Sequence, residues 1–235
     1  MRNQLFIRVF ALAAIFAALT AFMLPLNTEQ TGYSGEKFSK LSIAVKSKVY
    51  IEQGESYKLD IQTDENTLQK ISVEYNSDEL EIKCKTGSRI DEAVLIYITT
   101  PTLEAISLAG SSDLYIENTF KTGKMHLSLA GSGKMEIKDL KADKVSASIA
   151  GSGNILLAGG NNGAFEDFSI AGSGKIDAAG FAAAKAEVDI AGSGDCSIFA
   201  SENLKVSIAG SGNVHYKGSP VLNSETAGSG RVSKL

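Results

Sequence analysis

Tryptophan is absent from this 235-residue chain, and histidine and cysteine occur only twice each. Without tryptophan, the largest aromatic platform for a sugar ring is missing. Basic residues are not in excess either, because 23 Lys and Arg stand against 27 Asp and Glu, for a formal net charge of −4. This balance excludes the positive surface that holds a nucleic-acid backbone, so nucleic acid is not an expected partner.

Long apolar runs are also scarce, and the clearest one lies at the N-terminus. Residues 9–26 are uncharged and mostly apolar, and they follow Arg2 and Arg8, as in an export signal. The run is at the lower length limit for spanning a bilayer, while Leu19-Thr20-Ala21 lacks the small residue expected three positions before a cut. Residues 1–26 are therefore either a cleaved signal peptide or an uncleaved N-terminal anchor, which would be the only contact with a membrane. Residues 27–36 are polar and contain glycine, so we expect a flexible linker.

Glycine, in contrast, is abundant, with 23 residues, and many of them belong to a repeat. After Ala109-Gly110-Ser111-Ser112, the motif Ala-Gly-Ser-Gly (AGSG) recurs at spacings of 21, 20, 21, 20, 18 and 18 residues, beginning at Ala130, Ala150, Ala171, Ala191, Ala209 and Ala227. A fixed period near 20 residues without a helical pattern is typical of a β-solenoid. We therefore predict an all-β protein with a parallel, right-handed β-helix of about 20-residue coils over residues 104–235.

Apolar residues alternate with polar ones on both sides of each motif, which predicts two short strands per coil joined at an AGSG corner. Glycine suits such a corner because it adopts positive φ and has no Cβ to meet the neighbouring coil. Stacked corners place the motif serines in one column, about 4.7–4.9 Å apart. We expect these hydroxyls to satisfy one another and the corner amides, with binding of sugars or ions as the alternative.

The position after each motif argues against repeated calcium loops, which need a carboxylate in every repeat. Its residues are mixed in charge: Asp113, Lys134, Asn154, Lys175, Asp195, Asn213 and Arg231. The two histidines, His126 and His215, are expected to face outward more than four coils apart, too distant to share a metal. No metal or other cofactor is expected.

Residues 37–103 show alternation without the glycine corner, and we expect them to form a hairpin-rich β region that caps the solenoid. Gln53-Gly54-Glu55-Ser56 and Asn76-Ser77-Asp78-Glu79 separate adjacent runs as hairpin-like turns. Pro101 marks the passage into the regular coils, because proline cannot donate to a strand ladder. Cys84 and Cys196 each take the place of an inward apolar residue, so free buried thiols are expected, although a disulfide between them is not excluded.

One column resembles catalytic machinery. Asp177, Ser197 and His215 occupy the same outward position, three residues after the corner glycine, in consecutive coils. Their order is unsuited to a triad because Ser197 lies where the histidine would have to be. We therefore predict a solvated face with no catalytic residues. Tyr115 is the one evident outward aromatic residue in the coils, which leaves little support for aromatic sugar binding.

The export leader, the stretch Ile96-Tyr97-Ile98-Thr99-Thr100-Pro101-Thr102-Leu103, the repeated motif and the closing Asn213-Val214-His215-Tyr216-Lys217-Gly218-Ser219-Pro220 together resemble a bacterial family named "putative auto-transporter adhesin", the GIN domain. The resemblance covers about residues 36–233. It implies a β-helical, exported bacterial protein, in the periplasm, at the cell surface or in the outer envelope, and transfers no catalytic residues.

Three classes of function remain. The first expectation is a non-enzymatic, adhesin-like module that binds a protein or glycan surface ligand. The alternative is a structural envelope protein that forms homo-oligomers through its solenoid ends. The least favoured is a polysaccharide-acting β-helix enzyme, because coils of 18 to 21 residues leave no long loops to build a groove.

Overall fold

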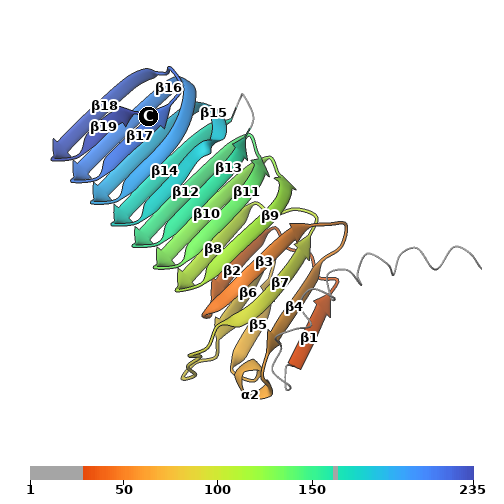
Figure 1. The fold of residues 1–235 in the computed structure, drawn as a ribbon. Helices are drawn as coiled ribbons and strands as arrows, with labels where there is room; N and C mark the ends of the chain where they lie inside the picture. The colour runs from red at the N-terminus through yellow and green to blue at the C-terminus, as the bar shows by residue number, and fades with distance from the viewer. Residues whose placement is uncertain (1–28, 161–163) are drawn as a thin grey trace, which may run out of the picture.

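A computed structural model describes residues 29–160 and 164–235 (Figure 1). Strands make up 72% of it and helix 2%, and the chain forms a parallel β-solenoid of about 6 turns with a spacing of about 20 residues. The predicted fold class is therefore confirmed. The expected leader, residues 1–26, lies outside the described residues. Within the described part, no helix has the length and apolar character needed to cross a membrane.

Two parallel sheets build the solenoid, and the AGSG corners join them (Figure 1). The sheet whose strands lead into the corner is called here the pre-corner sheet. It contains β8 (Ala105–Gly110), β10 (Lys124–Gly131), β12 (Lys144–Gly151), β14 (Phe165–Gly172), the second parts of β15 (Lys175–Gly192) and β16 (Asp195–Gly210), and β18 (Val221–Gly228).

The post-corner sheet contains the strands that leave the corner. These are β9 (Asp113–Lys121), β11 (Lys134–Lys141), β13 (Asn154–Gly160), the first parts of β15 and β16, β17 (Asn213–Lys217) and β19 (Arg231–Lys234). After a register shift, β9 and β11 also pair along a short third side, where Leu140 lies beside Phe120. Strands β15 and β16 continue through this side without a break in the strand assignment.

The core lies between the two sheets and is filled by every second side chain of each strand. Along β10, the burial pattern alternates so that Met125, Leu127 and Leu129 are buried while the residues between them face outward. Parallel pairing then stacks each inward residue on its counterpart in the next coil, as with Leu129 and Ile149. One continuous apolar core results, with aromatic rings such as Phe120 and Phe168 fully buried.

The corner is built by glycine in the way the sequence predicts. The first glycine of the AGSG motifs has φ between 127° and 136°, as in Gly131 and Gly210. A Cβ on these residues would lie 2.2–2.4 Å from the carbonyl oxygen of the equivalent glycine in the preceding coil. Two constraints therefore act on one residue: a backbone conformation that favours glycine, and a contact that leaves no room for a side chain.

Part of the N-terminal β region is built into the coil stack. Strands β2 (Lys40–Ala44) and β3 (Ser47–Gln53) form a coil between β6 (Glu79–Cys84) with β7 (Val94–Thr100) on one side and β8 with β9 on the other. The spatial order of these coils thus differs from their order in the chain. Ser112, which replaces the second glycine in the first motif, is buried and donates a hydrogen bond of 2.6 Å to the carbonyl of Val45.

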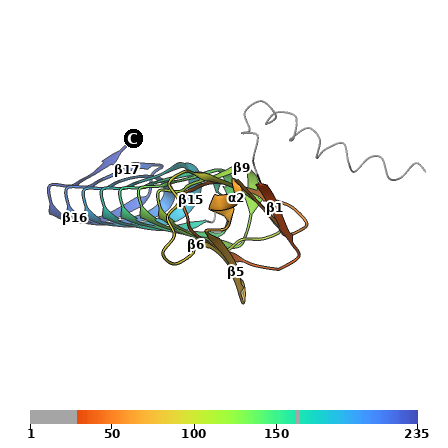
Figure 2. The ribbon, with the colours of Figure 1, turned by 90° about the horizontal axis from the view of Figure 1, so that it is seen from below.

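Antiparallel strands lie outside the coil of β2 and β3 and the coil of β6 and β7 (Figures 1 and 2). Strand β5 (Ile71–Asn76) forms a hairpin with β6, which confirms the turn at Asn76–Glu79. The expected hairpin at Gln53–Ser56 is wrong, because β4 (Lys58–Thr63) pairs with β7 and with β1 (Glu29–Ser34). The short helix α2 (Glu65–Leu68) follows β4 and is capped by Asp64. The expected linker is also different: its residues 29–34 form β1, because the edge of β4 offers unpaired backbone groups to them.

The corner geometry makes a prediction. Gly192→Val forces a β-branched side chain to a φ of 130° and against the carbonyl of Gly172, 2.4 Å from the new Cβ. We expect a loss of roughly 1–3 kcal/mol or more in the free energy of unfolding. Gly123→Val is the matched control, since no atom lies within 4 Å of its added Cβ. Urea midpoints that fall equally for both variants would contradict this account of the corner.

Candidate binding surfaces

Small side chains line the pre-corner sheet beside the AGSG corner. Three outward columns meet there and are named together the Ser–Ala face. One column follows the strands and contains Ser107, Ser128, Ser148, Ser169, Asp189, Ser207 and Glu225. The others are the motif alanines (Ala109, Ala130, Ala150, Ala171, Ala191, Ala209 and Ala227) and the motif serines (Ser111, Ser132, Ser152, Ser173, Ser193, Ser211 and Ser229), all of them exposed.

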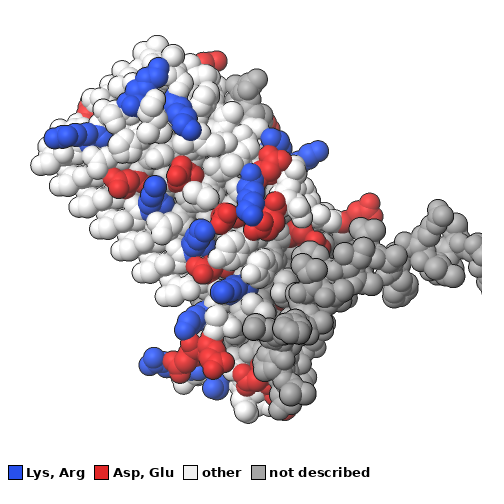
Figure 3. Space-filling model, in the orientation of Figure 1, with Lys and Arg blue, Asp and Glu red and all other residues white. Residues whose placement is uncertain are grey.

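The motif serine hydroxyls are not used by the corner itself. The corner amides bond instead to backbone carbonyls of the preceding coil, as Ser152 N does to Gly131 O at 2.9 Å and Asn154 N to Gly133 O at 3.0 Å. The expectation that hydroxyls satisfy these amides is therefore wrong, because the coils approach closely enough for direct backbone bonds. Within the described residues, the motif hydroxyls have no side-chain hydrogen bond and face the solvent. Figure 3 shows the corner as a stepped edge without charged side chains.

A tyrosine ladder lies on the post-corner sheet near its N-terminal end. The ring of Tyr50 stacks on Tyr97 with a centroid distance of 5.3 Å and on Tyr115 with a distance of 5.4 Å. The expectation for Tyr115 concerned the predicted coils, residues 104–235, whereas both of the other rings come from residues before them. The sequence alone does not reveal the ladder, because the coil holding Tyr50 is inserted between the coils of Tyr97 and Tyr115. No repeated motif indicates that insertion.

The ladder stabilises the sheet more than it presents a ligand platform. The stacked ring faces of Tyr50 cover those of its neighbours, and Lys134 Nζ lies 5.7 Å from the ring centroid of Tyr115. A sugar therefore meets ring edges rather than open faces. Burial raises the pKa values of the Tyr97 and Tyr115 hydroxyls, so both stay protonated at neutral pH and can donate hydrogen bonds.

The column predicted to be non-catalytic does form. Asp177 pairs in register with Ser197, and Ser197 with His215. The structure adds Ser233, whose Oγ lies 2.9 Å from Nδ1 of His215. Ser233 was not among the residues predicted for this column, although it occupies the same position after the corner in the last coil. Because Ser197 and Ser233 flank His215, neither neighbour in the column is the carboxylate that a triad requires to orient its histidine.

Metal-ligating side chains are not brought together. Among the described residues, no group of three or more His, Cys, Asp or Glu side chains could hold a metal ion. The mixed column does align, and Asn213 Nδ2 donates to Asp195 Oδ1 at 3.0 Å. Both cysteines are free, Cys196 being buried and Cys84 half-buried. The burial predicted for Cys84 is therefore only partial.

Glu166 is a carboxyl group inside the core. It takes the inward position that Val145 holds in the coil before and Ala186 in the coil after, and its side chain is fully buried. Neither carboxyl oxygen has a hydrogen-bond partner among the described residues. Burial raises the pKa of Glu166 well above its usual value, and burial also raises the pKa of the Cys196 thiol, with Glu166 adding to the effect. A neutral carboxyl is the form that this apolar environment favours.

The spacing of Glu166 in the sequence already indicates that its side chain faces inward. Glu166 lies two residues before Phe168 and four before Ile170, so it has the same inward parity as both. A search for apolar residues alone begins this strand at Phe168.

A shallow groove of about 260 Å³ crosses the pre-corner sheet at the margin away from the corner. Phe165 and Val221 contribute apolar surface to it. Its charged residues Glu187 and Lys205 form an ion pair with each other, which neutralises both charges. Lys144 Nζ lies 5.4 Å from the centroid of the Phe165 ring. The groove therefore offers a mixed surface without a cluster of convergent polar groups.

A known protein family matches most of this chain. The model of a family described as "Putative auto-transporter adhesin, head GIN domain" matches residues 37–220. The chain belongs to this family. The resemblance indicated by the repeated motif is therefore confirmed. Among curated proteins, none matches this GIN-domain chain.

Solved structures share the fold of this GIN domain. A "putative adhesin" from Bacteroides fragilis NCTC 9343 is 25% identical with a TM-score of 0.84, and the match covers 90% of this chain and 98% of that chain. A "putative lipid binding protein" from Parabacteroides distasonis ATCC 8503 is also 25% identical, with a TM-score of 0.71 and coverage of 89% and 97%. A "putative adhesin" from the same strain, 24% identical with a TM-score of 0.73 and coverage of 89% and 97%, shows the fold alone.

Glu166 generates a prediction about pH. Because its pKa is raised in the folded state, its carboxyl favours folding below the unfolded pKa, about 4.3, and this contribution is lost as the pH rises through the folded pKa. Glu166→Gln removes the ionisation. We expect the variant to gain stability over the parent as the pH rises, by up to about 1.4 kcal/mol per pH unit. Urea unfolding between pH 4 and pH 9 measures the difference.

The control for this experiment is Glu187→Gln, one coil further on and at the surface beside Lys205. Its stability relative to the parent should show no such rise with pH. Parallel pH profiles for the parent and the Glu166→Gln variant would mean that water or a neighbouring group satisfies the carboxylate.

The tyrosine ladder generates a second prediction. Tyr50 is the central ring, so Tyr50→Ala removes two stacked pairs, whereas Tyr97→Ala removes one. We expect Tyr50→Ala to lower the free energy of unfolding by about 1–3 kcal/mol and by more than Tyr97→Ala. Tyr50→Phe keeps both stacks and serves as the control. Equal losses for the two alanine variants, measured by urea unfolding, would show that the stacking adds little.

Proposed function

We propose that this chain is a non-enzymatic, exported module of the bacterial envelope that binds a protein or glycan on another surface. The Ser–Ala face is its contact surface. The observation that carries the proposal is the repetition of the same small outward residues through seven consecutive corners, from Ala109 to Ser229. Membership of a family named for adhesins supports it.

Small side chains favour contact with an extended surface for two reasons. Alanine has no side-chain rotamers to lose and serine has few, so ordering the face on binding costs little entropy. The serine hydroxyls can donate and accept hydrogen bonds, and the parallel strands repeat them at about 4.7–4.9 Å. A ligand with repeated polar groups can therefore make the same contact in several coils.

The charge of the face distinguishes this binding mode from electrostatic adhesion. Asp189 and Glu225 are the two charged residues among its three columns. An interaction through uncharged hydroxyl and methyl groups depends little on ionic strength. We therefore expect binding to persist at high salt concentration.

The other surfaces support a non-enzymatic role. His215 contacts Ser233, and the other neighbour in its column is Ser197, so neither neighbour in the column is a carboxylate that could orient the histidine. Strands and short turns account for most of each coil. Export is proposed from the apolar sequence of residues 9–26 and from the family name. The name of the Parabacteroides distasonis lipid-binding protein makes lipid vesicles a useful additional probe.

An array of bacterial and host glycans and proteins, probed with residues 27–235, tests the proposal. Ser169→Arg places a long charged side chain on the Ser–Ala face, where Ser169 is exposed, and should weaken binding at least about tenfold by holding the ligand away. Asn154→Arg is the matched control, because Asn154 is exposed on the post-corner sheet.

The outcomes separate the possibilities. Ligand binding that Ser169→Arg weakens and Asn154→Arg preserves supports the proposal. Equal weakening by both variants, or binding to lipid vesicles alone, would contradict the assignment of the Ser–Ala face. Hydrolysis of an array glycan that is lost on His215→Ala would make the protein an enzyme.

A further inference from the structure

The tyrosine ladder is a continuous stack of three phenol rings on neighbouring strands. Tyr50 on β3 pairs in register with Tyr97 on β7 and with Tyr115 on β9, and the three strands are parallel. Parallel strands in register send these side chains out in the same direction. The planes of adjacent rings are inclined by 16° and 22° only, so the edge of each ring runs along the edge of the next. The ortho carbons of adjacent phenols therefore lie beside one another.

A carboxyl group lies at each end of this ladder. On β4, Asp60 pairs in register with Tyr97, and on β11, Glu136 pairs in register with Tyr115. Lys134 donates a hydrogen bond to Glu136 and thereby lowers the pKa of that carboxyl, so Glu136 is ionised at neutral pH. A carboxylate beside a phenol can accept the proton that the phenol loses when it is oxidised.

The edges of the three rings are accessible to an oxidant. Tyr50, Tyr97 and Tyr115 are half-buried, because stacking covers their faces and leaves their edges toward the solvent. Burial raises the pKa values of Tyr97 and Tyr115, so these phenols are protonated and lose a proton together with each electron. The product of one-electron oxidation is a neutral phenoxyl radical, whose unpaired electron is shared between the oxygen and the ortho carbons.

We propose that the tyrosine ladder is a site of oxidative cross-linking, at which hydrogen peroxide, activated by a haem peroxidase, joins Tyr50 to Tyr97 or to Tyr115 through a carbon–carbon bond. Two adjacent phenols each give up one electron and one proton, and the resulting radicals couple at their ortho carbons. The two ortho hydrogens then move to the oxygens, which restores both phenols. The peroxide takes up the two electrons and two protons and becomes two water molecules. The reaction needs no ligand, so the inference is independent of the function proposed above.

Stacking favours coupling within one chain. The ring centroid of Tyr50 lies 5.3 Å from that of Tyr97 and 5.4 Å from that of Tyr115, so small rotations of the side chains bring ortho carbons into contact. Holding two reactants side by side greatly raises their effective concentration. Tyr97 and Tyr115 lie on opposite sides of Tyr50, about two strand spacings apart, which is too far for them to couple with each other. Tyr50 must therefore take part in every bond.

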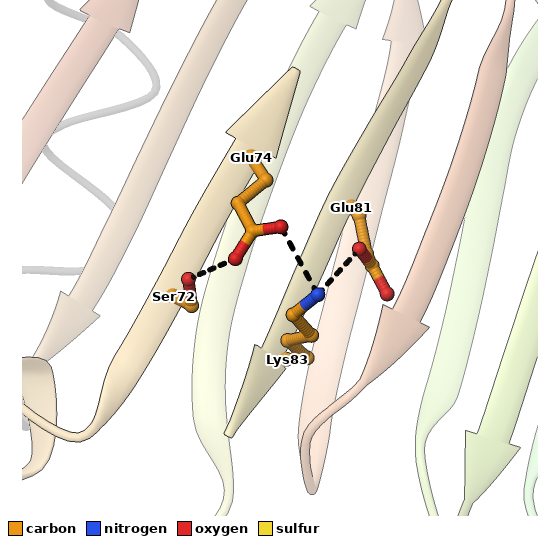
Figure 4. A network of polar contacts seen from close by, with 4 residues as sticks. All are labelled: Ser72, Glu74, Glu81 and Lys83. Carbon is orange, nitrogen blue, oxygen red and sulfur yellow. Dashed lines mark hydrogen bonds and ion pairs between the residues drawn. The ribbon is translucent and has the colours of Figure 1, made fainter. Parts of the chain in front are cut away.

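Such a bond would hold together coils that are otherwise joined by noncovalent contacts. On the hairpin of β5 and β6, for example, Lys83 Nζ contacts Glu74 Oε2 at 3.0 Å and Glu81 Oε2 at 2.7 Å, and Ser72 Oγ donates to Glu74 Oε1 at 2.8 Å (Figure 4). Salt weakens ion pairs that are exposed in this way, whereas it does not weaken a carbon–carbon bond. A cross-link at Tyr50 also restricts the unfolded chain, as a disulfide does, and should therefore stabilise the folded state.

Treatment of a dilute solution of residues 27–235, which contain every described residue, with hydrogen peroxide and a haem peroxidase tests the proposal. We expect a monomeric product that has lost two hydrogens and shows dityrosine fluorescence. Trypsin leaves Tyr50 in the peptide 49–58 and both of its partners in the peptide 90–121, so mass spectrometry should find these two peptides joined. The urea midpoint of the product should be higher than that of the untreated chain.

Phenylalanine variants identify the bond. Tyr50→Phe keeps both stacks but lacks the hydroxyl, so the yield of joined peptides should fall at least about tenfold. Tyr97→Phe and Tyr115→Phe each leave one adjacent pair of phenols and should still cross-link, whereas the double variant should behave like Tyr50→Phe. Tyr216→Phe is the matched control, because Tyr216 is also half-buried on the post-corner sheet but lies outside the ladder. Its yield should equal that of the parent.

Three results would overturn the proposal. The first is an oxidised parent chain in which the two peptides are not joined. The second is an undiminished yield in Tyr50→Phe, which would assign the bond to Tyr57 in the same peptide. The third is a product that consists mainly of covalent dimers in dilute solution, which would mean that the stacked rings do not favour coupling within one chain.

Discussion

The close approach of successive backbones at the AGSG corner is the constraint on which the rest of this structure depends. A Cβ at Gly192 would lie 2.4 Å from the carbonyl oxygen of Gly172, and the amide of Ser193 bonds to that oxygen at 2.9 Å. Glycine is thus required by the space and by a φ of 130° at once. Because every coil is fixed to the last at this point, a slip of one residue would turn the inward set of side chains outward.

Because the register is fixed, equivalent residues of successive coils stack in columns. The columns differ in which side chains they accept. The inward columns are apolar, and Glu166 shows the chemical limit of that rule, since a carboxyl group can enter by remaining neutral. Outward columns are free to vary, as the column from Asp113 to Arg231 does. The Ser–Ala face varies much less than this column. Corner geometry accounts for its glycines, whereas the hydroxyl groups of the motif serines have no hydrogen bond among the described residues that would require serine there.

The sequence predicts the part of the fold that repeats, because the spacing of the motifs shows which residues of successive coils lie side by side. The corner, the two strands per coil and the alignment of Asp177, Ser197 and His215 all follow from the spacing of the motifs. The N-terminal coils could not be derived in this way. The coil of β2 and β3 lies between strands that come later in the chain, so its neighbours are set by long-range packing and not by local pattern. The tyrosine ladder of Tyr50 depends on that insertion.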